Sequence, residues 1–595
     1  MSVSEEKINE VGKKAQENAN LIWNAANSLF GAFKPHEYGL VILPMCVIKR
    51  FHDCLLPTHQ AVLEANKKFA SAGPLKAGFL KKASGYQFYN TSEYTFDKLK
   101  ADPENIEENF DDFLHGFSDN VIEILTRMNF FAAVDRMKEA KVLYQIIVDF
   151  STENLDMSEK HFSAVDMGYI FENLVQRFSE SYDEEAGAHF TSRDIIYLMC
   201  DLLVVNSDAL NDDDGLHCTV YDMTMGTSQM LTCMEERLKQ IDKNADVKTF
   251  GQEINPFTMG IAAADTLIHG GDPDNMKFGD TLSDDQFSGY QFDFCISNPP
   301  FGIDWKREAV VVEKEHKLGE QGRFAPGLPG KSDGQMLFLL NGLAKLKDNG
   351  RMAIIQNGSS LYTGDAGSGQ SDIRKYVIEN DWLDAIVQLP NDSFYNTPIT
   401  TYVWILDKQK SIRNPGKIQL IDASKCCVER KKSIGNKKYD ISDECRNLIL
   451  RAYTEYSTED YEQTLGDGTV IYCKSKILDS INLGYSKVTV ESPLLDDEGQ
   501  YVMKKGKKVA DVSKRDTENI PLSVDIDDYI RDEVLPYNPD AWVDKSKTKV
   551  GYEIPFIRTF YEYKKPEPVD DIVQRVTDLE KDISKSLNTL FHKED

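Results

Sequence analysis

The stretch Phe292-Asp-Phe-Cys-Ile-Ser-Asn-Pro-Pro-Phe301-Gly302 joins an apolar strand to a rigid polar loop. The two prolines lack N–H groups and fix φ, so the loop is stiff and its carbonyl oxygens are free to accept hydrogen bonds. The side-chain oxygen of Asn298 and the carbonyl of Pro299 would form a pair of acceptors for an exocyclic amine, and Phe301 offers a face for a planar base. The alternative is a plain rigid turn, which the complete pattern makes the weaker interpretation.

A second strand-to-turn pattern lies upstream, in Val220-Tyr-Asp-Met-Thr-Met-Gly-Thr-Ser-Gln-Met-Leu231. In an α/β sheet such a turn lies at the carboxyl end of a strand, where ligands bind. The backbone at Gly226 and the carboxylate of Asp222 suit a cofactor with a cationic amino-acid end. Because the motif has one glycine, an ordinary strand-to-helix turn is favoured when the motif is considered alone.

Two acidic residues follow at the expected ends of the next strands. Glu253, in Phe250-Gly-Gln-Glu-Ile-Asn255, is placed to accept both hydroxyls of a ribose. Asp280, in Lys277-Phe-Gly-Asp-Thr-Leu282, suits an adenine amino group. Each residue also has a non-functional interpretation: Glu253 as a solvated surface glutamate, and Asp280 as part of a simple turn.

The order of these four features decides between the alternatives. Short β-rich runs alternate with helical patterns after about residue 160, which predicts βαβ units and a mostly parallel sheet. The four features follow successive strands: a turn after the first, an acid after the second, an acid after the third, and Asn-Pro-Pro-Phe after the fourth. This is the arrangement of an S-adenosylmethionine-dependent amino methyltransferase.

The flanking regions differ from this α/β segment. Residues before about 155 show helical periodicity, for example in Ala19–Phe30, Tyr38–Leu56 and Glu107–Met128, and no convincing strand. The C-terminal end carries a heptad-like apolar seam, made by Ile572, Val576, Leu579, Ile583, Leu587 and Leu590. We therefore expect a helical N-terminal domain (1–155), a Rossmann-like methyltransferase domain (156–420), a C-terminal extension (421–568) and a helical tail (569–595).

Composition sets limits on the function. The 595 residues include 68 Lys+Arg and 97 Asp+Glu, a formal net charge of -29. Such a chain is a poor binder of duplex DNA by itself, although a local basic cleft or a basic partner would change this. The sequence lacks the apolar core of a signal peptide near residue 1 and any run long enough to span a bilayer. Its ten cysteines form no CxxC pair, so we expect reduced thiols, no metal site and a cytoplasmic protein.

The sequence resembles a known family nearly end to end: the modification (M) subunits of type I restriction-modification systems, which are adenine-N6 DNA methyltransferases. Besides the motifs above, the resemblance rests on Ala19-Asn-Leu-Ile-Trp23, Tyr38-Gly-Leu-Val-Ile-Leu-Pro44, Tyr89-Asn-Thr-Ser92, Met167-Gly-Tyr-Ile-Phe-Glu172, Glu185-Ala-Gly-Ala-His-Phe-Thr191, Gly322-Arg-Phe324, Lys331-Ser-Asp-Gly334, Gln356-Asn-Gly-Ser359, Gly364-Asp-Ala-Gly-Ser-Gly369, Ile373-Arg-Lys375 and Phe394-Tyr-Asn-Thr397.

The resemblance implies a role for individual residues. The target-adenine site would consist of Asn298, Pro299, Pro300 and Phe301. The S-adenosylmethionine pocket would consist of Phe190, Thr191, Asp222, Gly226, Thr227, Glu253 and Asp280, with Asn298 bordering both sites and no metal.

The chain departs from the family pattern at two positions. Ser228 stands where the family usually has a second glycine, and Ser192 stands where the family has proline after Phe-Thr. A serine in a position that needs positive φ would cost roughly 1–2 kcal/mol, and its side chain would crowd the methionine part of the cofactor. We expect an active enzyme with weakened cofactor affinity.

The resemblance also implies partners: a specificity (S) subunit that reads the DNA sequence, a second copy of the M subunit in an M2S complex, a restriction (R) subunit, and double-stranded DNA. The C-terminal seam is the candidate for docking on S, and the alternative is a helix that packs on its own domain. Two rival functions remain open at this point. One is an amino methyltransferase that modifies RNA bases or glutamine side chains of proteins. The other is a non-catalytic scaffold in which Ser228 and Gln229 have closed the cofactor site.

Overall fold

The computed structural model describes residues 19–34, 37–152, 155–163, 166–167, 170, 174, 191–205, 207, 216–300, 302–395, 397–563 and 567–591. Phe190 and Phe301, two of the candidate site residues, lie outside these ranges. The chain divides into two compact units, Met1–Ile554 and Pro555–Asp595. Among the described helices, none has the length and apolar character needed to cross a membrane.

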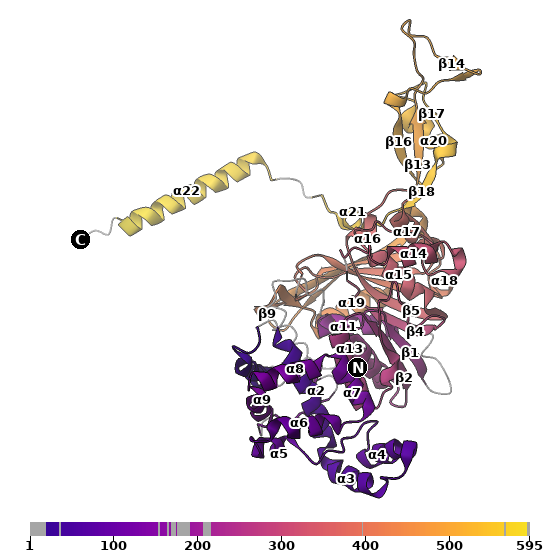
Figure 1. Cartoon of the computed structure of the whole chain (residues 1–595). Coiled ribbons are helices and arrows are strands. Elements are labelled where there is room, and N and C mark those ends of the chain that lie inside the picture. The colour runs from indigo at the N-terminus through magenta and orange to yellow at the C-terminus, as the bar shows by residue number, and fades with distance from the viewer. Residues whose placement is uncertain are drawn as a thin grey trace. The chain divides into compact units, whose positions relative to one another are not determined.

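The N-terminal region is helical, as the sequence predicts. Its described part contains no β-strand, only isolated bridges such as Asn90 with Phe117. Almost every side chain of α2 is buried, which explains the apolar run from Leu40 to Ile48 in this segment. Residues 19–26 are helical, and the helices that follow are α2 (Gly39–Leu55), α3 (His59–Lys68), α4 (Lys76–Ser84), α5 (Phe96–Ala101), α6 (Ile106–His115), α7 (Asp119–Arg127), α8 (Phe130–Glu139) and α9 (Leu143–Phe150), coloured indigo to purple in Figure 1.

The periodic segment Glu107–Met128 forms two helices, α6 and α7, rather than one. The break lies at Gly116, where a Cβ atom would stand 2.2 Å from the side-chain oxygen of Asn90. The carbonyl of Gly116 accepts a hydrogen bond from the backbone N–H of Thr91 at 2.7 Å. This contact with a distant loop ends α6, and periodicity alone does not reveal it.

The second region is built on a ten-stranded sheet in the order β11-β12-β8-β6-β7-β5-β4-β1-β2-β3. Central strands such as β4 and β7 are buried along their whole length, which accounts for their continuous apolar sequences. The strands are β1 (His217–Asp222), β2 (Asp246–Glu253), β3 (Met276–Phe278), β4 (Phe292–Ser297), β5 (Leu346–Asn357), β6 (Leu383–Gln388), β7 (Thr401–Asp407), β8 (Lys417–Lys425), β11 (Glu459–Thr464) and β12 (Val470–Asp479).

The sheet is more mixed than the sequence analysis predicts. The pairs β1–β2, β2–β3, β1–β4, β4–β5 and β6–β8 are parallel. The pairs β5–β7, β6–β7, β8–β12 and β11–β12 are antiparallel. The reason is that the chain returns from β6 to β7 without a crossover helix, which parallel pairing of those two strands would require. The parallel half, from β5 to β3, carries the predicted ligand-binding strand ends.

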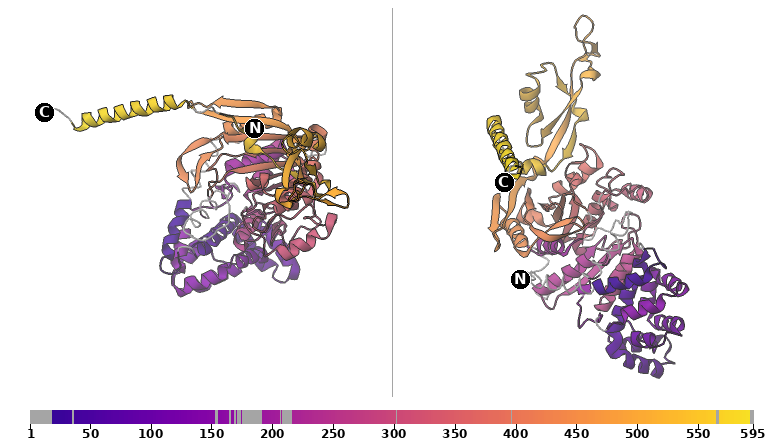
Figure 2. Two further views of the ribbon diagram at one scale, coloured as in Figure 1. Left: turned by 90° about the horizontal axis from the view of Figure 1, so that it is seen from above. Right: turned by 90° about the vertical axis from the view of Figure 1, so that its left-hand side faces the viewer.

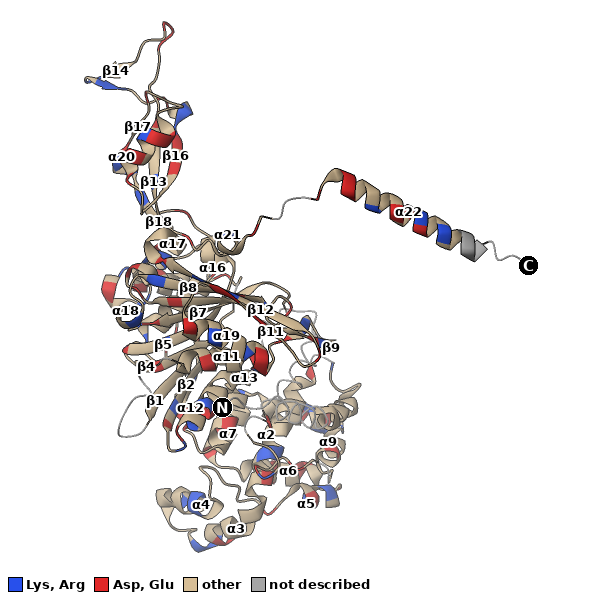
Figure 3. Cartoon of the chain, turned by 180° about the vertical axis from the view of Figure 1, so that it is seen from behind, with Lys and Arg blue, Asp and Glu red and all other residues tan. Residues whose placement is uncertain are grey.

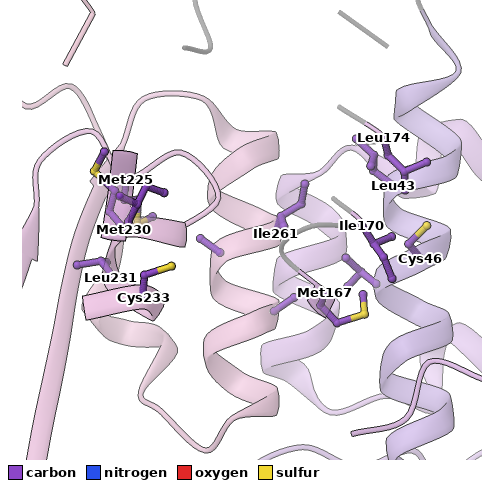
Figure 4. Packing of buried hydrophobic residues seen from close by; sticks show 14 of the residues in the cluster. Leu43, Cys46, Met167, Ile170, Leu174, Met225, Met230, Leu231, Cys233 and Ile261 are labelled. Atoms are coloured by element: carbon purple, nitrogen blue, oxygen red, sulfur yellow. The ribbon is translucent and has the colours of Figure 1, made fainter. Parts of the chain in front are cut away.

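Helices connect this sheet to the N-terminal region through one buried cluster. The cluster contains Leu43 and Cys46 of α2, Ile261 of α13 and Leu231 and Cys233 of α12 (Figure 4). The helical region therefore shares its core with the sheet region. The helices beside the sheet are α11 (Arg193–Val204), α12 (Gln229–Ile241), α13 (Pro256–Ile268), α14 (Ala309–His316), α15 (Gln335–Ala344), α16 (Ser359–Tyr362), α17 (Gly369–Glu379), α18 (Lys410–Arg413) and α19 (Asp443–Glu455).

The segment after β12, which the sequence pattern leaves undefined, forms a separate small sheet. Val488, Val490, Ile520 and Ile530 form a core within this segment. A hairpin, β14 (Met503–Lys504) and β15 (Lys507–Lys508), extends from it. The other elements are β13 (Gly484–Glu491), β16 (Asp516–Pro521), α20 (Ile526–Tyr529), β17 (Trp542–Val543) and β18 (Lys549–Tyr552), and a further hairpin, β9 (Val428–Ile434) with β10 (Lys437–Asp440), precedes β11.

The second unit contains α21 (Phe556–Phe560) and α22 (Val569–Phe591), the latter drawn as the long yellow helix in Figure 2. The predicted apolar seam lies on α22. Its members Ile572, Val576, Leu579, Ile583 and Leu587 are exposed, together with Val573, while the side chain of Leu590 lies outside the described residues.

All ten cysteines are free thiols, and all except Cys427 are buried. This confirms the expectation that most of them are buried thiols. In the described ranges, no group of three or more His, Cys, Asp and Glu side chains has a metal-binding arrangement.

Candidate active site at the ends of β1 to β4

A cavity of about 470 Å³ lies at the carboxyl ends of the parallel strands. It contains one residue or turn from each of the four predicted motifs, because parallel strands place their carboxyl ends on the same edge of a sheet. The candidate residues that line it are Thr191, Asp222, Gly226, Thr227, Glu253, Asp280, Asn298 and Pro300. Pro299 is buried in the same loop but is not among the lining residues.

Asp222 stands at the end of β1 and is only 1% exposed. Its Oδ1 atom accepts hydrogen bonds from the Ser297 hydroxyl at 2.6 Å and from the Thr224 N–H at 3.0 Å. Within the part of the chain that the structure describes, no hydrogen bond reaches Oδ2. Burial raises the pKa of the Asp222 carboxyl to about 7, against the opposing effect of the two hydrogen bonds. A cation bound at this carboxylate would restore its ordinary acidity.

The turn after β1 is strained at Ser228. Gly226 has φ +53°, which costs glycine nothing, but Ser228 has φ +64°, in the left-handed region. This confirms the expectation that position 228 needs positive φ. Ser228 is 3% exposed and is not among the residues that line the cavity, whereas its neighbour Gln229 lines it and accepts a hydrogen bond from Arg193. Ser228 therefore costs free energy through its backbone conformation. The side chain of Gln229, not that of Ser228, limits the space in the cavity.

Replacing Ser228 with glycine is expected to stabilise the protein by about 0.5–1 kcal/mol. Relief of the left-handed serine contributes roughly 1–2 kcal/mol, and the greater freedom of glycine in the unfolded chain removes part of it. The Ser228 side chain makes no capping hydrogen bond to α12, so little is lost on its removal. Urea unfolding of Ser228→Gly and Ser228→Ala measures the difference. Equal stabilisation by alanine, which keeps the Cβ atom, would contradict the explanation.

Glu253 connects the end of β2 to the glycine turn. Its Oε2 atom accepts a hydrogen bond from the Gly226 N–H, and Oε1 accepts one from the Asn255 N–H, both at 2.8 Å. Burial raises the pKa of Glu253. An ionised carboxylate has about four acceptor positions, so the two oxygens can still accept hydrogen bonds from two hydroxyls of a ligand in the cavity.

The loop that carries Asp280 is held in place by Arg323. The Arg323 guanidinium donates to the carbonyls of Thr281 at 2.7 Å and Leu282 at 3.1 Å, and it pairs with Glu315 of α14 at 2.7 Å. A Cβ atom at Gly322 would stand 2.2 Å from the Glu315 carbonyl oxygen. The Gly322-Arg-Phe324 motif therefore positions one wall of the cavity.

Asn298 brings an unpaired acceptor to the other wall. The side chain is 8% exposed, and its Nδ2 atom donates to the Thr191 hydroxyl at 2.8 Å. Its Oδ1 atom is buried and has no hydrogen-bond partner among the described residues. A buried polar atom without a partner is unfavourable unless a ligand satisfies it. With the amide oriented by Thr191, Oδ1 is the free acceptor of this site.

A polar network supports the loop after Pro300. The Gly302 N–H donates to Oδ1 of Asp333 at 3.4 Å, and Oδ2 of Asp333 accepts from Nε2 of Gln335 at 2.7 Å. The same Nε2 atom also lies 2.8 Å from Oδ1 of Asn357 at the end of β5 and 2.6 Å from the hydroxyl of Ser359, and its second N–H serves one of these two acceptors. The motifs at residues 331–334 and 356–359 thus meet beside the Asn-Pro-Pro loop.

A family model described as N-6 DNA Methylase matches residues 163–493, which is more than half of the 595 residues. The chain belongs to the N-6 DNA methylase family. A second model, described as the HsdM N-terminal domain, matches residues 18–150 and thus the helical region. The resemblance seen in the sequence is confirmed.

Curated relatives of this N-6 DNA methylase are methylase subunits of type I restriction enzymes. The MpnII subunit of Mycoplasma pneumoniae is 30% identical over 226 residues, which is 36% of this chain and 39% of that protein. The HindI subunit of Haemophilus influenzae is 26% identical over 269 residues, or 44% of this chain and 55% of that protein. The matches thus span about half of these relatives or less.

The fold is shared with a solved methyltransferase subunit of a type I restriction-modification system from Streptococcus thermophilus. The TM-score is 0.61 at 22% identity, and the match covers 79% of this chain and 97% of the other. The predicted fold class, a helical region followed by an α/β methyltransferase sheet, is therefore confirmed.

Several residues that line the cavity were not predicted from the sequence. Ile254 and Leu282 line the cavity beside Glu253 and Asp280, as do Trp305 and Phe338 from farther along the chain. The position of Ile254 directly after the acid was a usable signal, because a planar base needs apolar faces next to its hydrogen-bonding edge. No sequence pattern around Trp305 or Phe338 indicated that these residues line the cavity.

Proposed function

We propose that this chain transfers a methyl group from S-adenosylmethionine to the N6 amine of adenine in duplex DNA, as the M subunit of a type I restriction-modification complex. The observation that carries the proposal is the buried, unpaired Oδ1 atom of Asn298, in one cavity with Asp222, Glu253 and Asp280. Family membership and the names of the curated relatives support it.

The acceptor groups that line the cavity fit S-adenosylmethionine. Asp222, with its open Oδ2 atom, would hold the cationic amino group, next to the backbone of Gly226 and Thr227 and near Thr191. Glu253 would accept hydrogen bonds from the ribose hydroxyls. Asp280 would accept a hydrogen bond from the adenine amine, and the apolar side chains of the adjoining loops would lie on either side of the base. Phe190 would complete the pocket. When bound, the cofactor supplies a methyl group on a sulfonium centre that an amine can attack directly.

Asn298 is the residue that acts on the acceptor. Its Oδ1 atom would accept a hydrogen bond from the N6 amine, and the carbonyl of Pro299 would accept the second. These two acceptors draw electron density onto the nitrogen and fix the direction of its lone pair, so the rate gain comes from positioning and electrostatics. The amine proton is released after transfer, and the chain forms no covalent intermediate.

The target adenine has to leave the duplex to reach Asn298, because a stacked base cannot enter a cavity of this kind. Flipping costs a few kcal/mol. Stacking on Phe301 beside Pro300 would offset part of this cost, since base–aromatic stacking contributes about 1–3 kcal/mol.

The chain is proposed to act in an M2S complex, with an S subunit that selects the DNA sequence and an R subunit that joins for cleavage. Its net charge of -29 favours this division, because DNA affinity must then come largely from a partner. The exposed seam of α22 offers the docking surface for S: a helix with one apolar stripe is stable when the stripe packs on a partner helix.

The docking role of α22 predicts a difference between its two faces. Leu579→Ala with Ile583→Ala removes apolar area from the seam and is expected to weaken binding to S by about tenfold or more. Gln574→Ala with Asp578→Ala removes two side chains from the opposite face and should leave binding unchanged. Co-purification and a binding titration with S distinguish them, and equal behaviour of the two variants would refute docking through the seam.

Methylome sequencing tests the function in the host. Comparison of cells with and without this gene and its neighbours should show the loss of one split motif that carries N6-methyladenine. An unchanged pattern of N6-methyladenine would count against the proposal.

A further inference from the structure

The small sheet formed by β13, β16, β17 and β18, which we call the addition, lies mostly beyond the family model, since of these strands only β13 falls within the matched residues 163–493. The family model ends at residue 493, so residues 494–552 lie beyond it. The addition has its own apolar core and is drawn in orange above the large sheet in Figure 1. The hairpin β14–β15 extends from this small sheet.

The hairpin places three lysines at its turn. Lys504 pairs with Lys507 across the strands, and Lys505 and Gly506 form the two-residue turn. Lys505 has φ +51°, a conformation that asparagine or glycine adopts more easily. Like charges directly opposite each other on two strands are also unfavourable. Both features lower the local stability of the hairpin, so stability does not explain why lysines stand at this tip.

Most other cations of the addition have acidic partners, such as Lys508 with Asp540 at 2.8 Å and Arg515 with Glu491 at 2.9 Å. In contrast, Lys504, Lys505 and Lys507 are exposed and have no ion pair within the described ranges. Figure 3 shows them as the blue segment at β14. We call these three residues the lysine tip.

The base of the addition is fixed to α16 and α17, two helices beside the large sheet. Arg374 of α17 donates from Nε to the Tyr552 carbonyl at 2.6 Å and from Nη1 to the Ser360 carbonyl at 3.0 Å. Ser360 follows Ser359, which belongs to the polar network behind the Asn-Pro-Pro loop. A buried guanidinium thus joins β18 to α16, next to the polar network that contacts the Asn-Pro-Pro loop.

We propose that the lysine tip binds the phosphate backbone of the DNA whose adenine enters the Asn298 cavity. This inference rests on the proposed function. Ammonium groups on flexible stems suit phosphates, which need charge more than fixed geometry. The acidic loop Asp496–Glu498 of the same addition would repel DNA, so the proposal places the hairpin, and not this loop, against the duplex.

The test uses the full chain in complex with S and compares two triple variants. Lys504→Gln, Lys505→Asn and Lys507→Gln remove the charges, whereas Lys504→Arg, Lys505→Arg and Lys507→Arg keep them. The measurement is the DNA dissociation constant at several salt concentrations. Each lost phosphate contact lowers the slope of log affinity against log salt by about 0.9, so the neutral variant should lose about 2.7 and the arginine variant nothing. Cofactor affinity should be equal in all three proteins.

Each outcome decides the proposal. An unchanged slope in the neutral variant, in a wild-type complex that methylates DNA, overturns the role of the lysine tip and leaves the function intact. Loss of co-purification with S in the neutral variant would place the lysines on a protein partner and also overturn it. A wild-type complex that neither binds nor methylates DNA would refute the proposed function itself.

Discussion

Asn298→Ala is expected to lower the rate constant of methyl transfer at saturating substrates by about 10²–10³-fold or more, the loss typical for one preorganised electrostatic group. The variant removes the unpaired Oδ1 atom that would accept a hydrogen bond from the amine. Because the side chain lies at the end of β4 and makes one described hydrogen bond, to Thr191, folding and binding of S should be retained. Transfer of a labelled methyl group to DNA measures the effect.

Two further variants define the role of Asn298. Asn244→Ala changes an exposed asparagine in the turn before β2 and should have normal activity. Thr191→Ala keeps the acceptor and removes only the partner that orients it, so a smaller loss than in Asn298→Ala is expected. Near-normal turnover in Asn298→Ala would show that the amine is held elsewhere.

Asp222→Asn should have opposite effects on stability and on cofactor binding. Burial raises the pKa of Asp222 from its ordinary value of 3.8 to about 7. The folded state therefore holds the proton more tightly, and the stability of the wild type falls as the pH rises from about 4 to 7. Asparagine removes this loss, so the variant should withstand more urea than the wild type at pH 8. The difference should shrink toward pH 4.

Cofactor affinity should show the reverse pattern. The amino group of S-adenosylmethionine is attracted by the ionised carboxylate, so wild-type affinity should fall by about tenfold for each pH unit below 7. In Asp222→Asn the affinity should be weaker at pH 8 and nearly independent of pH between 6 and 8. Calorimetry at several pH values measures both. Equal pH dependence in the two proteins would refute contact between Asp222 and the amino group.

The parts of the site that the sequence predicts correctly are those set by local chemistry. A buried parallel strand has a continuous apolar sequence and ends in a polar or glycine-containing turn, so Asp222, Glu253, Asp280 and Asn298 could be placed at strand ends. Parallel pairing then brings those ends to one cavity. The predicted roles of the individual residues remain proposals.

Contacts between distant segments could not be predicted from local patterns. The link from Arg323 to the loop of Asp280 spans about 40 residues of sequence, and the break at Gly116 depends on Asn90. The antiparallel position of β7 depends on how the chain returns from β6, which apolar runs do not encode. The sheet of residues 484–552 was missed because β17 and β18 are short and because charged residues interrupt the apolar pattern of β13 and β16.

We propose that this cavity delivers a methyl group to adenine in DNA. The most direct measurement incubates the chain, with S, with S-adenosylmethionine labelled in the methyl group and with DNA, RNA and protein acceptors in turn, followed by identification of the labelled product. We expect label in DNA as N6-methyladenine, and none with Asn298→Ala. Label in RNA or in protein glutamine would show a different amino methyltransferase, and no cofactor binding with no labelled product would show a scaffold.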